Sequence, residues 1–259
     1  MKQIRPLLVP VVVTVAAMIA TPLAPVRGPL RRILSTVTVG GLFMSTLTRS
    51  ITRWGRFPAI TAAAVVAAGT TVVEHVGPRT GKPFGRYHYT DALQPQVSGV
   101  PAIVPAAWFA MAVPAREAAH GALGARSTRL RRIVLGSAAL TAWDLFLDPQ
   151  MTTEGYWEWE QPGRYRGIPF SNYLGWFLTG MAVMAVLEVL MPPGSRRSSA
   201  QSRGGDGFLV GQYTYMSVME TVGFAAFFKD RLVATAGGAT MLPIAIAAMI
   251  SGLRRHDPS

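Results

Sequence analysis

The stretch that decides the fold reads IVLGSAALTAWDLFLDPQMTTEGYWEWE and covers residues 133–160. It begins as an apolar run that supplies most of a membrane crossing, for which a helix needs about 20 residues. Two carboxylates, Asp144 and Asp148, stand at the end of this run, and Trp, Glu and Tyr residues crowd the segment after Pro149. The fold therefore has to accommodate an apolar helix with two acidic side chains at its C-terminal end.

The rest of the chain has the composition of a membrane protein. Half of the 259 residues are hydrophobic, only 15% are charged, and the mean hydropathy is +0.30. These values favour an all-α, polytopic membrane helical bundle with about eight transmembrane helices, in a range of about seven to nine. The expected spans are Leu7–Val26, Ile33–Ile51, Pro58–His75, Val100–Ala115, Ile133–Asp148, Tyr173–Met191, Phe208–Phe228 and Leu232–Leu253.

We expect residues 1–259 to form a single integral-membrane domain without a clean internal repeat. The segment 192–207 is rich in Gly, Ser, Pro and Arg, which is typical of a flexible linker, and it precedes the final two-helix hairpin. The first apolar run resembles a signal peptide. It is long for one, however, and further spans follow at once, so we expect it to be retained as a helix.

The net charge of +12 would suggest nucleic-acid binding in a soluble protein. Here most Lys and Arg residues lie in short loops between spans, where they set topology and meet lipid headgroups. We therefore predict a multi-pass protein of the cell membrane that contacts the lipid bilayer and no nucleic acid. The charge bias weakly favours cytoplasmic termini. The long loops 77–99 and 149–171 are separated by an even number of crossings, so they should share one face.

Carboxylates at membrane depth are costly, at about 2.5–3.5 kcal/mol each, and usually mark function. Asp144 and Asp148 are four residues apart and lie on one face of a helix. Glu74 ends the third expected span. We interpret Glu188 as structural, near a helix end, while Glu220 is equally consistent with a structural and a functional role. Solvated charges at the membrane interface are the alternative for the aspartates.

Two kinds of metal chemistry are disfavoured. The chain has no Cys, and its four His residues do not cluster at the spacing of metal ligands. Asp144 and Asp148 match the D-x-x-x-D motif of membrane prenyltransferases, but the N-D-x-x-D partner that would hold Mg²⁺ and diphosphate is absent. We therefore predict no metal site.

Both long loops contain aromatic residues. The first contains Tyr87 and Tyr89, and the second alternates Trp157 and Trp159 with glutamates. An ordered extramembrane loop and an interfacial aromatic belt are the simplest explanations. A belt alone does not require the alternation with Glu.

Taken together, two blocks of sequence resemble a family of carotenoid-biosynthesis membrane proteins. The first block contains EHVGPRTGKPFGRYHY at 74–89, followed by GVP at 99–101 and by Trp108. The second contains DLFLDP at 144–149, GYWEW at 155–159 and YRGIPFSNYLGW at 165–176. Characterised members of this family are carotenoid 1,2-hydratases, including bisanhydrobacterioruberin hydratases. The resemblance implies a hydro-lyase that adds water to the terminal C1–C2 double bond of an acyclic carotenoid, lycopene-like or C50.

This reaction would proceed by acid–base catalysis without a cofactor. Protonation of the alkene gives a tertiary carbocation, and a carboxyl group removed from water favours its neutral, proton-donating form. Aromatic faces would stabilise the cation, and a second carboxylate would take a proton from the attacking water. The expected catalytic residues are Asp144, Asp148 and, as their rival, Glu74; the expected substrate- and cation-binding residues are Trp143, Trp157, Trp159, Tyr87, Tyr89 and Asn172.

Two other functions remain open at this point. A proton-initiated carotenoid cyclase forms the same first cation but closes a ring without adding water. A membrane transporter would also bury carboxylates in a bundle, although stronger internal repeats would be expected. The expected partners are a membrane-dissolved carotenoid and other membrane enzymes of the pathway, such as a prenyl elongase and a desaturase.

Overall fold

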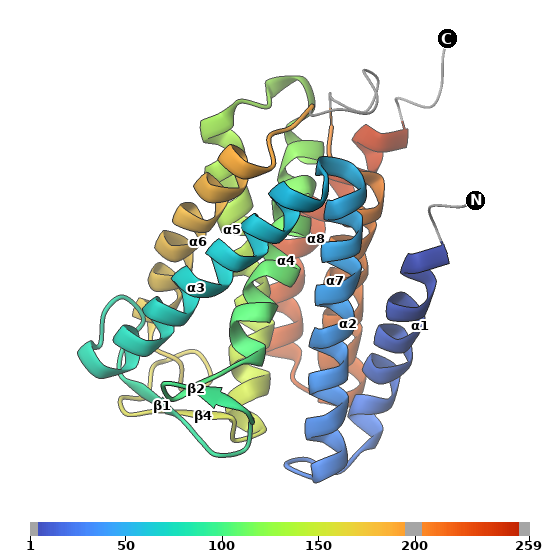
Figure 1. The fold of residues 1–259 in the computed structure, drawn as a ribbon. Coiled ribbons are helices and arrows are strands. Elements are labelled where there is room, and N and C mark those ends of the chain that lie inside the picture. The colour runs from blue at the N-terminus through green and yellow to red at the C-terminus, as the bar shows by residue number, and fades with distance from the viewer. Residues whose placement is uncertain (1–4, 195–203, 254–259) are drawn as a thin grey trace.

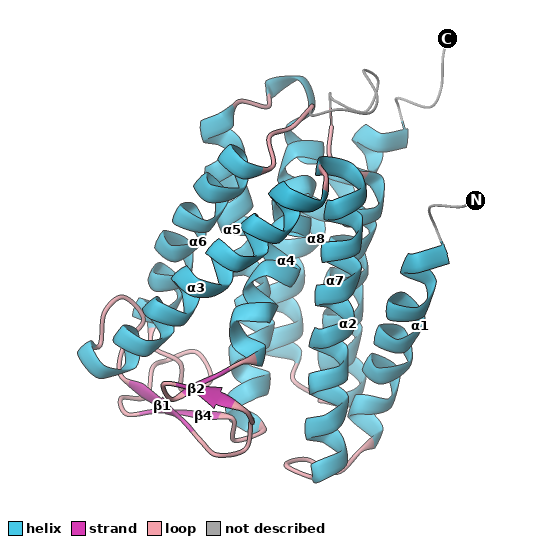
Figure 2. Cartoon of the chain, viewed as in Figure 1, coloured by secondary structure: helices cyan, strands magenta, loops and turns pink. Residues whose placement is uncertain are grey.

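The computed structural model describes residues 5–194 and 204–253, and within them the fold is all-α with eight α-helices, as predicted (Figures 1 and 2). The segment 192–207, predicted to be a linker, lies largely outside the described residues. The helices are α1 (Arg5–Ala20), α2 (Pro29–Trp54), α3 (Arg56–Thr80), α4 (Ile103–Leu123), α5 (Arg129–Thr153), α6 (Phe170–Leu190), α7 (Gly207–Val222) and α8 (Arg231–Leu253).

Several helices extend beyond the apolar runs that predict them. Helix α3 continues to Thr80 instead of ending near His75, and α5 continues to Thr153 instead of ending at Asp148. As a result, the carboxylates expected at helix ends lie inside helices. Helix α1 is shorter than expected and gives way to a 3₁₀ turn, Thr21–Leu23. Pro22 falls in this turn, where a proline cannot continue the α-helical hydrogen bonding.

Helix α4 is the core of the bundle and packs against α2, α3, α5, α7 and α8. Its side chains from Trp108 to Gly121 are all buried. Small residues allow the close packing: a Cβ added at Gly121 would lie 3.0 Å from the Cβ of Ala248 in α8. Such close backbone approach is how helices associate where no hydrophobic effect drives them together.

Two prolines inside helices leave a carbonyl oxygen without its helical donor, and other side chains supply one. Pro114 frees the oxygen of Ala110, which accepts hydrogen bonds from Thr46 at 3.0 Å and Gln212 at 3.3 Å. Pro149 frees the oxygen of Leu145, to which the Tyr165 hydroxyl donates at 2.9 Å. The second bond attaches the loop after α5 to the helical turn that carries the aspartates.

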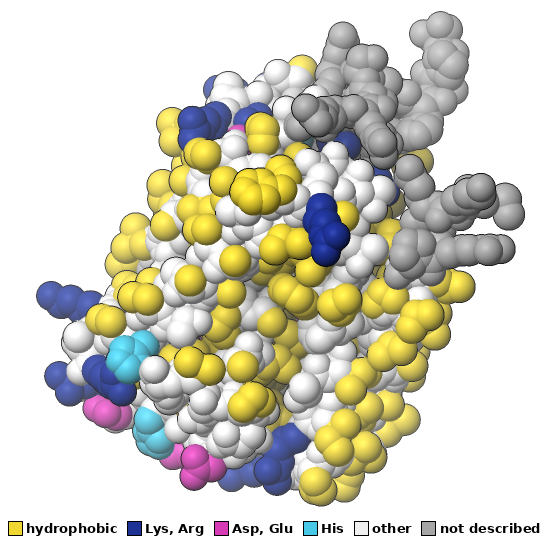
Figure 3. Space-filling model, viewed as in Figure 1, with side chains coloured by type: hydrophobic (Ala, Val, Ile, Leu, Met, Phe, Trp, Pro, Cys, Tyr) yellow, Lys and Arg dark blue, Asp and Glu magenta, His cyan; other side chains and the backbone are white. Residues whose placement is uncertain are grey.

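The outer surface is apolar over much of its area. Large hydrophobic side chains are exposed on the outward faces of several helices, among them Val9, Ile33, Val72 and Leu178. On the face in Figure 3, hydrophobic side chains cover most of the middle, while the acidic and His side chains lie mainly at the lower end. Among the described residues, α3, α6 and α8 are long and apolar enough to cross a membrane, judged by length and composition.

Short strands close one end of the bundle (Figure 1). Strand β1 (Tyr87–Tyr89) follows α3 and pairs antiparallel with β4 (Trp157–Trp159), which follows α5. Strands β2 (Gln96–Val97) and β3 (Val100–Pro101) form a second pair beside them. The pairing of β1 with β4 places the two long loops at the same end of the bundle, in agreement with the expected parity of the helices between them. In its register Tyr87 lies opposite Trp159, and Tyr89 opposite Trp157.

Candidate active site

Glu74 lies inside α3 with 4% of its surface exposed. Its Oε2 atom accepts hydrogen bonds from the hydroxyls of Tyr87 and Tyr89, the latter at 2.9 Å. Its Oε1 atom accepts from the indole N–H of Trp108, on α4, at 3.0 Å. All three donors are neutral. The carboxyl group is thus held in a fixed orientation by neutral groups.

Asp148, inside α5, is 1% exposed and is held in the same manner. Its Oδ1 atom accepts from the indole N–H groups of Trp157 at 2.6 Å and Trp159 at 3.2 Å. Its Oδ2 atom accepts from the Asn172 amide, on α6, at 2.7 Å. Again the three donors are neutral, and two come from one strand.

The two carboxyl sites are built alike. Each carboxyl lies on a helix, one of its oxygens faces two alternate rings of the strand after that helix, and its other oxygen faces a donor from the next helix. For Glu74 these elements are α3, β1 and α4; for Asp148 they are α5, β4 and α6. Alternate residues of a strand point to the same side. The two tyrosines of Y-x-Y and the two tryptophans of W-x-W can therefore each donate hydrogen bonds to a single carboxyl oxygen.

Asp144 is fully buried one turn before Asp148. Its Oδ2 atom accepts from the same Asn172 amide at 2.7 Å, so this one NH₂ group bridges the two aspartates. Its Oδ1 atom has no hydrogen-bond partner among the described residues. Because a buried carboxylate oxygen without a donor is unfavourable, the neutral, protonated form of Asp144 suits this position.

A cavity of about 60 Å³ lies between Glu74 and Asp148. Aromatic rings form much of its wall, and the polar side chains on the wall are the two carboxyl groups and Asn172. Trp108 stacks on Trp176 with ring centroids 4.0 Å apart. The rings that line the cavity are those of Tyr87, Tyr89, Trp108, Trp157, Trp159 and Trp176. We call this space the inner cavity.

A polar pocket of about 350 Å³ lies on the other side of the Glu74 cluster. Exposed residues of the strand end line it, including Arg79, Arg86 and Glu160, so it faces solvent. Glu74, Tyr87 and Tyr89 line both this pocket and the inner cavity. These three side chains therefore form a wall between an aqueous space and an aromatic one.

The two tyrosines of this wall keep their protons. Burial raises the pKa of Tyr87 well above its usual value, and the nearby Glu74 carboxylate raises it further. Burial and the same carboxylate raise the pKa of Tyr89 as well. Both hydroxyls are consequently available to donate to Glu74. A hydroxyl can also accept, so it can pass a proton on, whereas an indole N–H can only donate.

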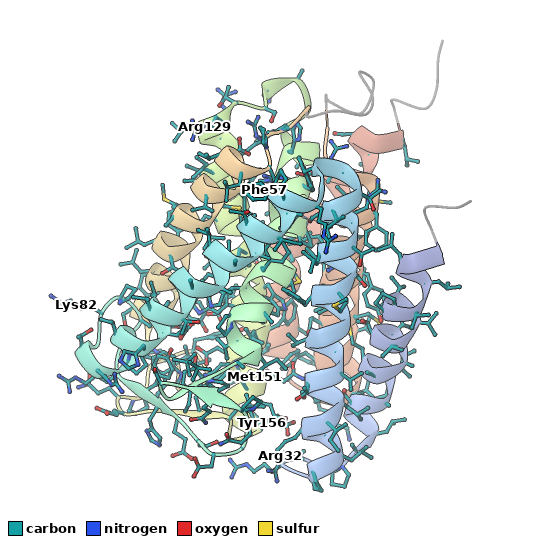
Figure 4. All side chains as sticks on the ribbon, in the orientation of Figure 1. Arg32, Phe57, Lys82, Arg129, Met151 and Tyr156 are labelled. Atoms are coloured by element: carbon teal, nitrogen blue, oxygen red, sulfur yellow. The ribbon has the colours of Figure 1, made fainter. Side chains whose placement is uncertain are left out.

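A third, mostly apolar pocket of about 180 Å³ lies between α2, α5 and α7. Met151 and Tyr156, two residues of its wall, are at the strand end of the bundle (Figure 4). It adjoins the inner cavity, because both are lined by Val39, Leu93, Ile103, Leu147 and Met151. Trp143, expected at the cation site, lines this apolar pocket and not the inner cavity.

The structure thus brings together most of the side chains expected from the sequence: Glu74, Asp148, Tyr87, Tyr89, Trp157, Trp159 and Asn172. Asp144 does not line the inner cavity, but it accepts a hydrogen bond from Asn172, which does. Sequence reasoning missed Trp108 and Trp176 as site residues, although both occur in the two motif blocks. Glu188 is ion-paired with Arg132 at 2.5 Å, consistent with a structural role.

The described residues contain no group of three or more His, Asp or Glu side chains that could hold a metal ion. The arrangement offers two carboxyl groups that face one enclosed aromatic space, one of them next to water. Such a site can move protons to and from a hydrophobic molecule.

Comparison with known proteins identifies relatives. A family model described as "Carotenoid biosynthesis protein" matches residues 28–251. Among curated proteins, the bisanhydrobacterioruberin hydratase of Haloarcula japonica is 34% identical over 118 residues. The aligned part is 45% of this chain and 40% of that relative, so it spans less than half of either protein. No solved structure matches this chain.

Proposed function

The chain belongs to the carotenoid biosynthesis protein family, and from this premise we propose that it is a carotenoid 1,2-hydratase. It adds water across the terminal C1–C2 double bond of an acyclic carotenoid. One observation carries the proposal: Asp148 and Glu74 face the same aromatic cavity, and Glu74 also faces the polar pocket. Acid, hydrophobic substrate and water can therefore meet at one place.

Asp148 is the acid. It lines the inner cavity, whereas Asp144 lines none of the three pockets. Protonated Asp148 gives its proton to C2 of the double bond, which leaves a tertiary cation at C1 and an aspartate anion. The N–H groups of Trp157, Trp159 and Asn172 already point at this carboxyl group. Donors placed in advance stabilise the charge that forms in the transition state.

The rings of the cavity wall stabilise the cation. A cation within about 6 Å of an aromatic face gains about 0.5–2 kcal/mol, more where water is excluded. Several tryptophan and tyrosine rings line the small cavity, so this attraction acts from more than one side. The same rings exclude bulk water from the acid, which prevents the cation from being captured at random.

Glu74 is the base. Water from the polar pocket reaches the wall formed by Glu74 and the two tyrosines, and its oxygen attacks C1 from there. Its excess proton passes to Glu74, either directly or through a tyrosine hydroxyl. The proton then leaves along Tyr87 and Tyr89 to the polar pocket. After the product departs, a proton from the polar pocket returns to Asp148 through water in the cavity, so each cycle consumes one water and no net proton.

Asp144 is a positioning residue. Its bond to Asn172 fixes the amide that donates to Asp148, and its protonated form keeps a second negative charge away from the acid. The water-side base favours hydration over cyclisation, because a cyclase would require the cation to be shielded from water.

We also propose that all eight helices cross the cell membrane. Helices α2, α4 and α5 contain 21 to 26 residues, sufficient in length, and most of their polar residues are buried or half-buried in the bundle. A membrane location matches a substrate that dissolves in lipid. Other membrane enzymes of the pathway, such as a prenyl elongase and a desaturase, would supply that substrate.

The test is expression of the chain in a host that makes lycopene or an acyclic C50 carotenoid. A hydratase adds the mass of one water for each modified end, and the new oxygen comes from ¹⁸O-labelled water and not from O₂. The absorption spectrum stays nearly constant because the conjugated system is untouched. A product of unchanged mass would indicate a cyclase. Unaltered pigments with a well-inserted protein would refute the enzyme proposal and favour transport.

A further inference from the structure

We propose that the apolar pocket between α2, α5 and α7 opens sideways into the lipid bilayer, between the end of α1 and the end of α7, and that the carotenoid enters through this opening. We call it the lateral opening; its rim is formed by Ile19, Val222 and Phe227. It rests on the proposed function, because it is the route by which that substrate reaches Asp148. It adds the side of the bundle and the leaflet from which the chain is drawn.

The enclosed spaces are too small for a whole carotenoid. The inner cavity measures about 60 Å³ and the apolar pocket about 180 Å³. Drug-sized ligands already occupy pockets of about 300–1,000 Å³, and lycopene or a C50 carotenoid is larger than such ligands. A molecule whose end group lies beside Asp148 must therefore leave the protein through an opening, with most of its chain outside.

Only one side of the inner cavity suits a hydrocarbon chain. Beyond Glu74 and its two tyrosines the cavity borders the polar pocket, which faces solvent. On the other side it adjoins the apolar pocket, and the two share five apolar wall residues. Since transfer of a hydrocarbon chain into water is unfavourable, the chain extends into the apolar pocket.

The outer rim of the apolar pocket is exposed and apolar. Ile19, in the last turn of α1, is 56% exposed, Val222, at the end of α7, is 49% exposed, and Phe227, in the π-helical turn after α7, is 55% exposed. Met216, deeper in the wall, is buried. Side chains that line a pocket and also reach the outer surface mark the place where it opens. Exposed apolar groups around a pocket favour an opening to lipid.

The packing of the helices leaves this side uncovered. Helix α1 packs mainly on α2 and stands at the margin of the bundle (Figure 1), whereas α7 packs on α4 and α8. A hydrogen bond of 2.9 Å from Gln212 to Thr46 joins α7 to α2. All pocket residues of these two helices lie on the strand side of that bond. The pocket is therefore closed toward the other end of the bundle and bordered at its side by the end of α1.

The lateral opening lies in one leaflet. Arg32, near the start of α2, is at the strand end of the bundle (Figure 4). Ser35 and Leu42 are the first and last pocket residues of α2, which places the pocket about 5–15 Å from Arg32 along the helix axis. The hydrocarbon core is about 30 Å thick. With Arg32 at the level of the headgroups, the pocket faces the hydrocarbon of the leaflet on the strand side, and the chain is drawn from there.

Two matched pairs of substitutions test this route. Thr38→Phe fills the pocket from α2, and Val222→Trp fills its rim from α7. The Thr38 hydroxyl has no hydrogen bond among the described residues, so its loss breaks none. Thr36→Phe and Val218→Trp make the same changes at exposed positions of the same two helices, outside the pocket wall.

The first measurement is kcat/KM for lycopene hydration in proteoliposomes. Overfilling the route should reduce kcat/KM about 5- to 100-fold in Thr38→Phe and Val222→Trp. The two control variants should stay within about twofold of the wild type.

The second measurement detects binding without turnover, with the same four substitutions in an Asp148→Asn protein. Lycopene should raise the Tm of the Asp148→Asn protein, because a ligand that binds only the folded state stabilises it. We expect a smaller increase in the two filled variants and an unchanged increase in the two controls. If Thr38→Phe fails to accumulate, Val222→Trp, at a lipid-facing position, makes the decision.

The lateral opening is refuted if the filled variants hydrate lycopene, and are stabilised by it, to the same extent as their controls. Failure of the hydratase assignment alone would look different. In that case the wild-type chain would convert no carotenoid, while lycopene would still stabilise the protein and the filled variants would still lose that stabilisation. Absence of both conversion and stabilisation would refute both proposals.

Discussion

Among the described residues, two clusters of buried carboxylates at opposite ends of the bundle are built on opposite principles. At the strand end, Glu74, Asp144 and Asp148 receive hydrogen bonds from Trp, Tyr and Asn only. At the other end, Glu117 is paired with Arg116 at 2.9 Å, and Asp206 with Arg49 at 2.7 Å. We call these the neutral-donor cluster and the arginine cluster.

The difference indicates what each cluster does. A carboxylate beside a guanidinium forms an ion pair that connects elements: Arg116 also donates to the carbonyl oxygens of Leu187 and Met191, at the end of α6. The backbone N–H of Asp206, the N-cap of α7, donates to Glu117 at 2.8 Å. A carboxyl group among neutral donors has no fixed charge partner and can exchange a proton. The first arrangement favours stability, and the second is the one that the proposed reaction requires.

The largest effect is expected for the acid. Asp148→Asn should reduce hydration about 10²- to 10⁴-fold, because an amide cannot supply the proton. The thermal stability in detergent should fall only modestly, since the two indole N–H groups can still donate to the amide oxygen and only the bond from Asn172 is lost. The assay is the rate of water addition to lycopene, followed by mass. Asp91→Asn, in an exposed loop position, is the matched control. Near-normal turnover of the Asp148 variant would transfer the role of acid to Glu74.

The opposite result is expected in the arginine cluster. Glu117→Gln leaves the fully buried Arg116 without its anion, a change that typically destabilises by about 3–5 kcal/mol. The variant should accumulate poorly and unfold at lower temperature, while the activity of each folded molecule stays close to that of the wild type. Thermal unfolding and activity per folded protein are the two measurements. If the variant lost specific activity but kept normal stability, the arginine cluster would have a role in activity, and the proposed difference between the two clusters would be wrong.

A smaller effect should separate the two aspartates. Asp144→Asn weakens the positioning of Asn172 but leaves the acid in place, so we expect a loss of about 10- to 100-fold, less than for Asp148→Asn. A positioning role also predicts a change in kcat with little change in KM. If the Asp144 variant is the more damaged of the two, Asp144 is the acid and the assignment of roles within the cluster is reversed.

The aromatic wall should show a graded response. Trp157→Phe keeps a ring but removes the N–H that donates to Asp148 at 2.6 Å. Trp157→Ala removes the ring as well and should lose activity by a further factor of about 2–30, the value of a cation–π contact. Relative hydration rates of the two variants measure the ring alone. Equal rates would show that Trp157 acts through its hydrogen bond and not through its face.

The last test leaves activity unchanged and concerns the placement of the clusters. Because the chain has no Cys, single-Cys labelling has no background. Probes at Thr80→Cys and Thr153→Cys, next to the neutral-donor cluster, should label from one side of the membrane. A probe at Ala125→Cys, in the loop after α4, should label from the other. Labelling of positions 80 and 153 from opposite sides would contradict the shared face of the two long loops.

The sequence predicted the helices well because long apolar runs in this chain all form helices. It placed several helix ends too early for a physical reason. Polar residues such as Arg116, Glu117 and Asp148 lower the local hydropathy in the same way whether they face water or are buried against a partner. A hydropathy pattern cannot tell these cases apart, so α4 and α5 are longer than their apolar runs.

The candidate site was predictable in part. The spacing of Asp144 and Asp148 placed them on one helical face, and the alternation of Trp157 and Trp159 indicated that both rings point the same way. The contact of Trp108 with Glu74 spans 34 residues and depends on how α4 packs on α3, which no local pattern specifies. For the same reason Trp143 could be grouped with the aspartates beside it, although its ring faces the neighbouring apolar pocket.

The pairing of β1 with β4 has a consequence for the order in which the protein is made. Tyr87 lies opposite Trp159, so the ribosome must synthesise both strands before the enclosure can close. A nascent chain that ends before residue 157 already contains Glu74, Asp144 and Asp148, but it lacks the indole groups that hold the acid. During biogenesis the surroundings of Asp148 therefore stay incomplete until β4 and the start of α6, with Asn172, have been synthesised. Under the proposed function, a half-made chain lacks groups needed to protonate a carotenoid.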